Sequence, residues 1–582
     1  MRTATTAFAL LLAALVAAPA HAQIHVDASN TGGIQDGQSW STAYADLQTA
    51  IDNATGSSEI WIAEGIYKPD SEGDSFTITG TIDGVELYGG FEGTETSLDQ
   101  RAPREHRTIL SGDLNGNDTD PDNDGVIEDA DPNRDGTPEN LSGANADHVL
   151  VLDGGSMSGI GDDGPRNVTT ATVIDGVIVT AGHADSRTPD TNGGGLYCDG
   201  AQSDNKCSPT LRNVRFSGNA ADDKGGAIYN NAVTSDGSTG PVASPEIKNA
   251  VFIGNTAADR GGAINNFGLD GGTSSPTITN AVFMSNTSGD RGGAIYNTGS
   301  GGTASPTITN ATLTGNASNN GAAIYNDGGF DGTASPVIAN TILWGNSASN
   351  SGGEIYNDNA SSTLSHSIIE GGDGGIANGT GFSDGTNNLN QDPQFVDGSN
   401  PTGPDGTFGT DDDGGNVLGG SPALDAGNNA ALPSGITTDI TGAVRTQDRD
   451  GNGTSTVNIG AYEAEVTLPP PSVGNLAPTA VYPGHPVVLT GSNLVAVSSV
   501  TYDGTSVSFA VENASTIRAR LPADASADAS FKVTTAGGTS TSPSVTVNAD
   551  APYGPERGLT FDGSGDYVPT GASGSALGLV NE

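Results

Sequence analysis

The sequence predicts an all-β protein in which a solenoid of stacked coils is followed by a β-sandwich. One run of sequence recurs between residues 208 and 358, and each copy has an Asn closing a Phe-x-x-Asn or Leu-x-x-Asn stretch. Subtracting neighbouring positions gives steps of 36, 31, 30 and 30 residues for Asn219, Asn255, Asn286, Asn316 and Asn346. A period of this length is typical of a solenoid. Short β-prone runs separated by Gly, Asn, Asp and Ser-Pro indicate that each copy forms one coil of strands.

The coils are expected to stack, because one coil holds too few large apolar side chains to offset its ordering entropy. Parallel stacking at about 4.8 Å places equivalent side chains above one another. The five recurring Asn residues are therefore predicted to form a buried ladder of amide hydrogen bonds; contact with a ligand is the alternative. Lys224, Arg260 and Arg291 each follow an Asp in register, and we expect a ladder of surface ion pairs there.

The repeats resemble those of the chlamydial polymorphic outer membrane protein family, whose marks are Gly-Gly-Ala-Ile and Phe-x-x-Asn. In the third copy these marks are Gly292-Gly293-Ala294-Ile295 and Phe283 to Asn286. The resemblance implies a right-handed parallel β-helix, the pectin-lyase-like solenoid, on a surface or secreted protein.

Segments on both sides of the repeats resemble secreted β-helix proteins of the choice-of-anchor Q type. The residues that carry this likeness are Tyr88-Gly89-Gly90-Phe91-Glu92-Gly93, Gly420-Ser421-Pro422-Ala423-Leu424-Asp425 and Asn458-Ile459-Gly460-Ala461-Tyr462-Glu463. We therefore expect one β-helix over 23–465, with repeats over about 172–370 and a choice-of-anchor Q-like part over about 371–465. Helical spacing over 45–51 predicts a short helix that caps the open end of the first coil.

The N-terminus has the pattern of a signal peptide over 1–22: an apolar run is followed by Ala20-His21-Ala22. The protein is therefore expected to be secreted or located on the cell surface or outer membrane, and no later apolar run is long enough for a transmembrane helix.

The composition is strongly acidic, with 69 Asp and Glu against 21 Lys and Arg and a formal net charge of −48. This charge opposes binding to nucleic acid or an anionic membrane, and the expected partners are glycans, matrix or other surface proteins. The charge suits a halophilic habitat, and a merely acidic secreted protein is the alternative. The oligomeric state is left open.

An Asp-rich loop over about 113–140 is a candidate calcium site. It contains two stretches with oxygen-bearing side chains at alternate positions before Gly125 and Gly136, as in the first half of an EF-hand-like loop. The twelfth positions lack the usual Glu, and a solvated acidic insertion is the alternative. The predicted ligands are Asp120, Asp122, Asp124, Glu128, Asp131, Asn133, Asp135 and Glu139. Asp448, Asp450 and Asn452 before Gly453 repeat the pattern more weakly.

Cys198 and Cys207 are the only cysteines, and in an exported chain they are predicted to form a local disulfide. A metal pair and free thiols are the alternatives. The histidines beyond the signal peptide stand singly and are expected to be loop or packing residues: His25, His106, His148, His183, His366 and His485.

A Pro-rich linker is predicted over 466–472, and 473–548 contains short alternating strands with frequent turns, as in a β-sandwich. Pro478, Tyr482-Pro483-Gly484 and Val500-Thr501-Tyr502-Asp503-Gly504 are similar to IPT/TIG immunoglobulin-like domains. Residues 549–582 contain a stretch, 559–568, that looks like the first strand of a laminin-G-like domain. This region is expected to be either a truncated domain or a disordered tail.

These observations favour a non-catalytic secreted or cell-surface protein with an adhesive, structural or binding role. Residues repeated in every coil build the coils, and repetition would present the same side chain at successive levels, which suits multivalent contact. The alternative is a polysaccharide lyase or glycoside hydrolase, because such enzymes use the same solenoid.

Overall fold

The computed structural model describes residues 22–121, 124–155, 167–185, 191–202, 204–234, 240–378, 386–404, 406–447, 454–463, 470–494, 497–513, 515–535 and 538–548. The chain divides into two compact units, Met1–Val466 and Thr467–Glu582. Residues 1–21 of the predicted signal peptide, Asp122, the acidic pattern at 448–453 and the tail after residue 548 lie outside the described residues. Among the described residues, no helix is long and apolar enough to span a bilayer.

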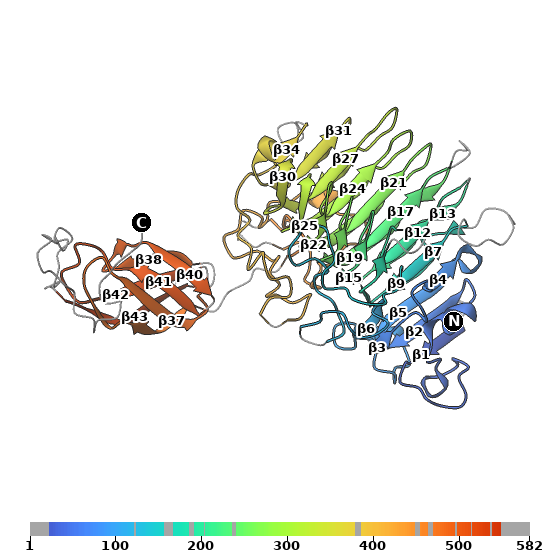
Figure 1. Cartoon of the computed structure of the whole chain (residues 1–582), viewed down its shortest axis with the longest axis horizontal. Coiled ribbons are helices and arrows are strands. Elements are labelled where there is room, and N and C mark those ends of the chain that lie inside the picture. Colours follow the sequence, from blue (N-terminus) through green and yellow to red (C-terminus); the bar gives the residue numbers. More distant parts are fainter. Residues whose placement is uncertain are drawn as a thin grey trace, which may run out of the picture. The chain divides into compact units, whose positions relative to one another are not determined.

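Unit 1 is a parallel β-helix, which confirms the predicted fold class (Figure 1). In its longest sheet each strand pairs in parallel with the equivalent strand of the next coil, as Ile278 does with Ile247 and Ile308. In five successive coils the sheet bends at an Asn in the left-handed region, for example Asn280 at φ 53°. Asn tolerates this conformation better than other non-Gly residues. Each coil therefore contributes two short strands to two faces.

The strands of this bent sheet are β1 (Ala22–Val26), β2 (Ser58–Ala63), β3 (Gly65–Tyr67), β5 (Glu86–Phe91), β6 (Thr108–Ser111), β9 (Val173–Asp175), β10 (Val177–Thr180), β14 (Thr210–Arg212), β15 (Arg215–Ser217), β19 (Glu246–Ile253), β22 (Thr277–Met284), β25 (Thr307–Thr314), β28 (Val337–Ala339), β29 (Ile342–Leu343), β32 (Thr363–Ser365) and β33 (Ile368–Ile369).

Three further parallel sheets complete the coils. The long one contains β4 (Phe76–Thr79), β7 (Leu150–Asp153), β12 (Leu196–Asp199), β17 (Ile228–Ala232), β21 (Ile264–Gly268), β24 (Ile295–Thr298), β27 (Ile324–Asp327), β31 (Ile355–Asp358) and β34 (Ile376–Ala377). The two short ones contain β11 (His183–Ala184), β16 (Ala220–Ala221), β20 (Thr256–Ala257), β23 (Thr287–Ser288), β26 (Ala317–Asn320) and β30 (Ser347–Ser351), and then β8 (Asn167–Val168), β13 (Lys206–Cys207) and β18 (Val242–Ala243).

The core is a set of apolar ladders that run along the helix axis. Phe216, Phe252 and Phe283 stack with ring centroids 5.4 and 4.6 Å apart and are at most 1 % exposed. These spacings match the distance between adjacent strands, so one coil buries its side chains against the same side chains of the next.

The predicted Asn ladder is also present in the interior. The amide of each of these Asn residues donates to the side-chain oxygen of the next, at 3.0, 2.9, 2.9 and 2.8 Å from Asn219 through to Asn346. The last amide donates to the Glu354 carboxylate at 2.6 Å. Glu354 stands where the earlier copies have Ala, so a carboxyl group supplies the acceptor that an Asn in the next coil would have offered.

Two more Asn ladders form at positions that the sequence did not single out. The first follows the bend of the long sheet and contains Asn213, Asn249, Asn280, Asn310 and Asn340. The second follows the Ile-Tyr-Asn part of the repeat and contains Asn230, Asn266, Asn297, Asn326 and Asn357. Neighbouring Asn residues of each ladder are thus hydrogen-bonded from one coil to the next.

The predicted helix near residues 45–51 is confirmed as α1 (Leu47–Asp52). The Asp46 carboxylate accepts a hydrogen bond from the Thr49 backbone N–H at 2.6 Å, as expected of an N-cap. Leu47, Ala50 and Ile51 are buried in the main core, so α1 covers apolar side chains of the first coil. The short 3-10 helices are η1 (Trp40–Thr42), η2 (Gly80–Ile82), η3 (Leu98–Gln100), η4 (Gly372–Gly375) and η5 (Asn429–Ala431).

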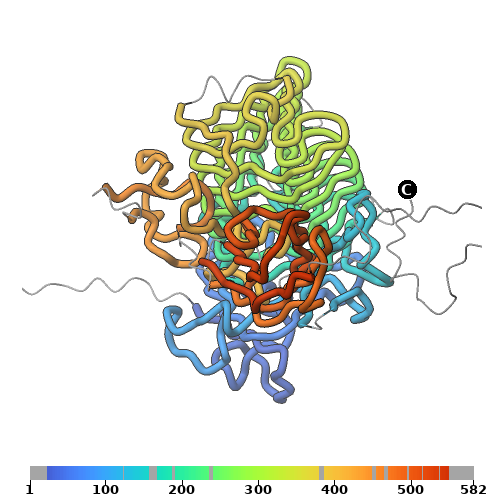
Figure 2. The backbone as a smooth tube through the Cα atoms, turned by 90° about the vertical axis from the view of Figure 1, so that its left-hand side faces the viewer, coloured from blue at the N-terminus to red at the C-terminus, as the bar shows by residue number. Residues whose placement is uncertain are grey.

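Two irregular segments lie against the outside of the coils (Figure 2). The Asp-rich loop crosses several coils: the Ser217 hydroxyl donates to the Ile127 carbonyl at 2.8 Å, and the Arg134 guanidinium donates to the Ser285 hydroxyl at 2.9 Å. A Cβ at Gly254 would lie 2.1 Å from the Glu128 carbonyl oxygen, so this close approach requires Gly.

The second segment, in its described parts 386–404, 406–447 and 454–463, packs on part of the outer face of the bent sheet. Tyr462 and Ile440 pack on Val282, and Ile459 packs on Ile342. The buried Arg445 guanidinium anchors the segment, because it donates to the Asn280 side-chain oxygen at 2.7 Å and pairs with Glu463 at 2.8 Å.

Unit 2 consists of two mainly antiparallel sheets and is compatible with the predicted immunoglobulin-like sandwich. One sheet contains β35 (Ser472–Ala477), β37 (Pro486–Ser492), β40 (Phe509–Asn513) and β41 (Thr516–Arg520). The other contains β36 (Ala480–Val481), β38 (Val497–Tyr502), β39 (Thr505–Ser506), β42 (Ala529–Thr535) and β43 (Gly538–Val547). Its own core, which includes Leu489, Ile517 and Phe531, is separate from that of unit 1.

Candidate functional site

The repeated Tyr and Arg side chains of the central coils pack against one another. Tyr296 and Tyr325 stack at 5.4 Å and are 0 % and 3 % exposed. Arg260 and Arg291 cover these two rings at 5.3 and 5.2 Å. Both arginines, like Lys224, also pair with the preceding Asp residue, as the repeat pattern predicts. These repeated side chains thus use one another as contact partners. Segments of the chain that are not repeated are therefore better candidates for a binding site.

A pocket of about 1080 Å³ lies on the outer face of the bent sheet. Its floor comes from β10, β15 and β19, and its walls come from residues 98–107, the Asp-rich loop and residues 406–409 of the C-terminal segment. The lining residues are Leu98, Asp99, Arg101, Ala102, Pro103, Arg104, Glu105, Arg107, Asp124, Gly176, Val177, Ile178, Asn213, Val214, Arg215, Asn249, Val251, Gly406, Thr407, Phe408, Gly409 and Ile440.

Arg215 is a basic residue in a row of mainly apolar residues on the outer face of the bent sheet. Its neighbours in register are Ile178 and Val251, and the ladder continues to both sides with Ile109, Val282, Thr312, Ile342 and Ile368. The C-terminal segment packs on Val251 and the positions after it. The pocket therefore opens next to the edge of this cover.

Three of the four arginines in the pocket pair with carboxylates. Arg101 Nη2 lies 2.7 Å from Asp175 Oδ2, and Arg215 Nη2 lies 3.1 Å from Glu128 Oε1. Arg107 Nη1 pairs with Asp124 Oδ2. Within the described part of the chain the fourth, Arg104, has no ion pair.

The guanidinium groups offer more donors than their partners use. Arg104 donates through Nη2 and Nη1 to the carbonyls of Ile440 and Thr441, at 2.9 and 3.0 Å. Arg215 makes both of its hydrogen bonds through Nη2, to Glu128 and Ser217, and its Nε has no partner among the described residues. Each guanidinium has five N–H donors. The pocket is therefore rich in donors at its floor and on one wall.

Burial lowers the pKa of Arg215, while the charges of Glu128 and Asp124 act in the opposite direction. An arginine nevertheless stays protonated at neutral pH, because its reference pKa exceeds about 12. Arg215 is therefore a fixed positive charge rather than a proton acceptor.

The predicted calcium ligands separate into two groups. Asp124 and Glu128 pair with Arg107 and Arg215 in the pocket. Asp131, Asp135 and Glu139 approach one another, with one carboxylate oxygen of each within 4.8 Å of the others. The remaining described ligands are Asp120, which accepts from the Gly125 N–H at 2.8 Å, and Asn133, whose amide donates to Glu139 at 2.7 Å.

The second group is the better cation candidate. Asp131 is 0 % exposed, and it accepts hydrogen bonds from the backbone N–H groups of Arg134 and Gly136, both at 2.7 Å. Burial raises the pKa of Asp131, so this carboxylate would gain from a bound cation. Three carboxylates and an amide oxygen are the hard ligands that calcium prefers.

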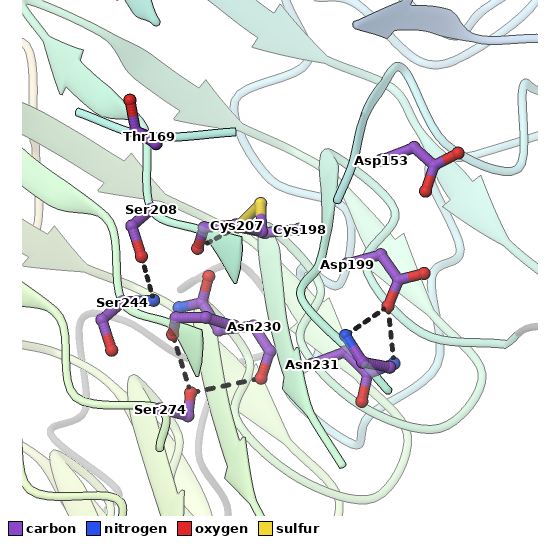
Figure 3. Close-up of a disulfide and its surroundings, with 12 residues drawn as sticks. Asp153, Thr169, Cys198, Asp199, Cys207, Ser208, Asn230, Asn231, Ser244 and Ser274 are labelled. Carbon is purple, nitrogen blue, oxygen red and sulfur yellow. Dashed lines mark hydrogen bonds between the residues drawn. A yellow bond between two sulfur atoms is a disulfide. The ribbon is translucent and has the colours of Figure 1, made fainter. Parts of the chain in front are cut away.

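The two cysteines form a disulfide between β12 and β13, as Figure 3 shows. Cys207 precedes Ser208, whose hydroxyl accepts from the Ser244 N–H at 3.2 Å. Asp199, next to Cys198, accepts from the Asn231 amide at 3.1 Å. The disulfide thus lies among hydrogen bonds that join adjacent coils, which fits a structural role.

None of the described histidines lines the pocket. His25 and His148 are buried against aromatic rings. His106 lies 2.9 Å from Glu64, which raises its pKa, and His183 lies 3.3 Å from Asp222. The His366 ring lies 2.9 Å from the Asn387 amide, and the His485 ring lies near the Pro483 carbonyl and the Tyr482 ring. These positions agree with the predicted packing and loop roles.

Comparison with known families matches two parts of the chain, residues 213–231 and 280–298, to the Chlamydia polymorphic membrane protein (Chlamydia_PMP) repeat. Both parts lie in the stacked coils. No protein of curated function matches the chain.

Similarities to solved structures are short. The chain is similar to SGBP-B from a complex xyloglucan utilization locus in Bacteroides uniformis, with 24% identity over 16% of this chain and 26% of that chain and a TM-score of 0.13. It is similar to Gamma-CGTASE from Alkalophilic bacillus clarkii, with 20% identity over 20% of this chain and 19% of that chain and a TM-score of 0.13. It is also similar to the Bacteroides ovatus mixed-linkage glucan utilization locus SGBP-B, in complex with a mixed-linkage heptasaccharide. The identity is 20% over 16% of this chain and 26% of that chain, and the TM-score is 0.12. Likenesses this limited carry no functional argument.

The pocket arginines were not singled out by the sequence, although two signals point to them. Arg101, Arg104 and Arg107 fall within seven residues of a chain that has only 21 Lys and Arg. Arg215 occupies the position before the Phe of Phe-x-x-Asn, where the later copies have Val, Val, Thr and Ile. Aligning the repeats by register would have shown this one basic residue.

Proposed function

We propose that this chain is an exported, non-catalytic surface β-helix that binds an oligosaccharide in the pocket on its flank and thereby takes part in adhesion. The observation that carries the proposal is the pocket itself, where the irregular segments at 98–107, 124, 406–409 and 440 meet the strands of the bent sheet. A surface location is supported by the repeat match, whose family is described as a membrane protein.

The chemistry of the pocket suits a sugar ligand. Leu98, Pro103 and Phe408 offer apolar surface, and Asn213 and Asn249 add amide groups on the floor. Ligand sites typically combine apolar lining with a few convergent polar groups in a volume of about 300–1,000 Å³. A volume of about 1080 Å³ is at the upper end of that range, which favours an oligomer over a small metabolite.

Blocking the pocket tests this proposal. Ile178 is half-buried on the floor, and Ile178→Trp would fill the space above β10. Val337→Trp is the matched control, because Val337 is an exposed strand residue, 46 % accessible, that does not line the pocket. We expect that an oligosaccharide identified by glycan-array screening binds the parent chain and Val337→Trp but does not bind Ile178→Trp. Retained binding by Ile178→Trp, or ligands restricted to matrix proteins, would contradict the proposal.

A polysaccharide lyase is the second candidate, because Arg107, Arg215 and Asp124 place basic and acidic groups in the same pocket. A lyase must remove a proton next to a uronate carboxylate, and the protonated Arg215 is poorly suited to that step. The assay is incubation with pectins, alginates and other uronates in the presence of calcium, followed by ultraviolet absorbance of unsaturated products and by reducing-sugar release. Sustained turnover would favour the enzyme over the adhesive protein.

We also propose that calcium binds Asp131, Asp135 and Glu139, with Asn133 at their edge. The support is the convergence of these carboxylates on a loop that contacts several coils. A cation there would neutralise like charges and hold the loop against the flank.

A further inference from the structure

The pocket concentrates arginine in an acidic protein. Its lining contains four arginines, whereas the chain as a whole has only 21 Lys and Arg and a formal net charge of −48. Asp99 and Glu105 are exposed, while Asp124 is paired with Arg107. Asp175 and Glu128 pair with Arg101 and Arg215, so Arg104 is the one pocket arginine without a carboxylate partner among the described residues.

The pocket arginines have more N–H donors than the acceptors that the described residues offer them. Arg104 is exposed and binds only two backbone carbonyls. Arg107 uses one nitrogen, Nη1, for its ion pair with Asp124, and its side chain remains 39 % exposed. The Arg215 side chain is 12 % exposed and has an Nε without a partner among the described residues. A surplus of N–H donors in a sheltered space complements a ligand with anionic oxygen atoms.

We propose that the pocket selects an anionic oligosaccharide, one that carries carboxylate or sulfate groups, and that Arg104 and Arg107 contact the anionic group above Arg215. This inference rests on the proposed function, because it names the chemical class of the oligosaccharide. It also implies that Asp124 competes with the ligand for Arg107.

The negative charge of the whole chain does not prevent such binding. At physiological ionic strength, charges separated by more than about 8 Å are largely screened, so acidic residues far from the pocket have little effect on a ligand inside it. Arginine also matches the planar, two-oxygen geometry of a carboxylate and the oxygen array of a sulfate ester. Neutral sugars would leave the donor surplus unused.

The test is calorimetric titration of the mature full chain with three probes of equal length: an oligogalacturonate, its methyl ester, and a sulfated oligogalactan. We expect the acid or the sulfate ester, or both, to bind, and the neutral methyl ester to bind at least about tenfold more weakly. Binding of only one anionic probe identifies which group the pocket prefers. Equal binding of acid and ester would overturn the selectivity but leave oligosaccharide binding intact.

Two variants assign the effect to the pocket. Arg104→Gln should weaken the anionic probe about tenfold, and Arg518→Gln, at an exposed arginine of unit 2, should leave it unchanged. Asp124→Asn should tighten the anionic probe, because it frees Arg107, and should not change the methyl ester. A loss of structure cannot produce tighter binding, so this variant separates recognition from folding.

Three results would contradict the inference. Unchanged affinity in both pocket variants would place the anion elsewhere. A chain that binds neutral oligosaccharides but neither anionic probe would overturn the inference alone. A chain that binds no oligosaccharide would overturn the proposed function as well.

Discussion

Replacing Asn286 with Leu should destabilise the β-helix by an amount that the ladder geometry sets. The Asn286 side-chain oxygen accepts from the Asn255 backbone N–H at 3.1 Å and from the Asn255 amide at 2.9 Å. Its own amide donates to the Phe252 carbonyl and to the Asn316 side chain, both at 2.9 Å. All of these groups lie in a fully buried site, because Asn286 is 0 % exposed.

After the substitution the Asn255 backbone N–H has no acceptor, whereas its amide keeps the Phe216 carbonyl at 3.0 Å. One orphaned donor costs about 1–3 kcal/mol, and each of the three other lost bonds costs about 0.5–1.5 kcal/mol. Burial of the Leu side chain offsets about 1.5–3 kcal/mol of this loss. The central values of these ranges give a net loss of about 3 kcal/mol in the free energy of unfolding, a large part of the roughly 5–15 kcal/mol typical of a folded domain.

Denaturant unfolding followed by tryptophan fluorescence measures this loss in unit 1 alone, because the three tryptophans are Trp40, Trp61 and Trp344. Thr277→Leu is the control, since Thr277 is exposed in the same coil. If Asn286→Leu changes the free energy of unfolding by less than about 1 kcal/mol, or no more than the control does, the ladder does not stabilise the coils as argued.

Three further predictions use other buried charges. Burial raises the pKa of Glu354 to about 8 from 4.5, so its contribution to stability is full below pH 4.5 and is lost as pH rises to 8. Over that pH window Glu354→Gln should become more stable than the parent, by about 3–5 kcal/mol at the upper end. Thermal melts at several pH values measure this difference. Calcium should raise the melting temperature of the mature chain and give heat in a calorimetric titration. Asp131→Asn should abolish both effects, whereas Asp124→Asn should not. An unchanged response in Asp131→Asn would place the ion elsewhere. Arg445→Met should cost about 3–5 kcal/mol, because it leaves Glu463 as an unpaired buried charge, and a double variant with Glu463→Gln should recover part of that loss in the same unfolding assay.

The parallel β-helix and its ladders could be predicted from the sequence because the period of the repeat is also the register of the structure. Each repeated residue meets its own equivalent in the next coil, as Ile278 meets Ile308. The position of Asn286 within its repeat therefore predicts its hydrogen-bond partners, Asn255 and Asn316. The same reasoning would have found the ladders of Asn280 and Asn297, had every repeated Asn been followed.

The end of the ladder needed the tertiary structure. The sequence shows that the last copy has Glu354 in place of Ala, but not that its carboxyl group accepts the Asn346 amide. The Asp-rich loop is similar: alternating oxygens predict a cation loop, whereas the separation of Asp124 from Asp131 depends on where Arg107 lies.

The sequence by itself determined the coils, their stacking and the composition of their core, because these depend on contacts between equivalent positions of adjacent repeats. Only the tertiary structure decided the pocket. Its arginines lie at 101–107 and at 215, its acidic partners at 124 and 128, and its far wall at 406–409. Such residues meet because irregular segments fold back over one face of the coils, and neither periodicity nor propensity specifies where an irregular segment comes to lie.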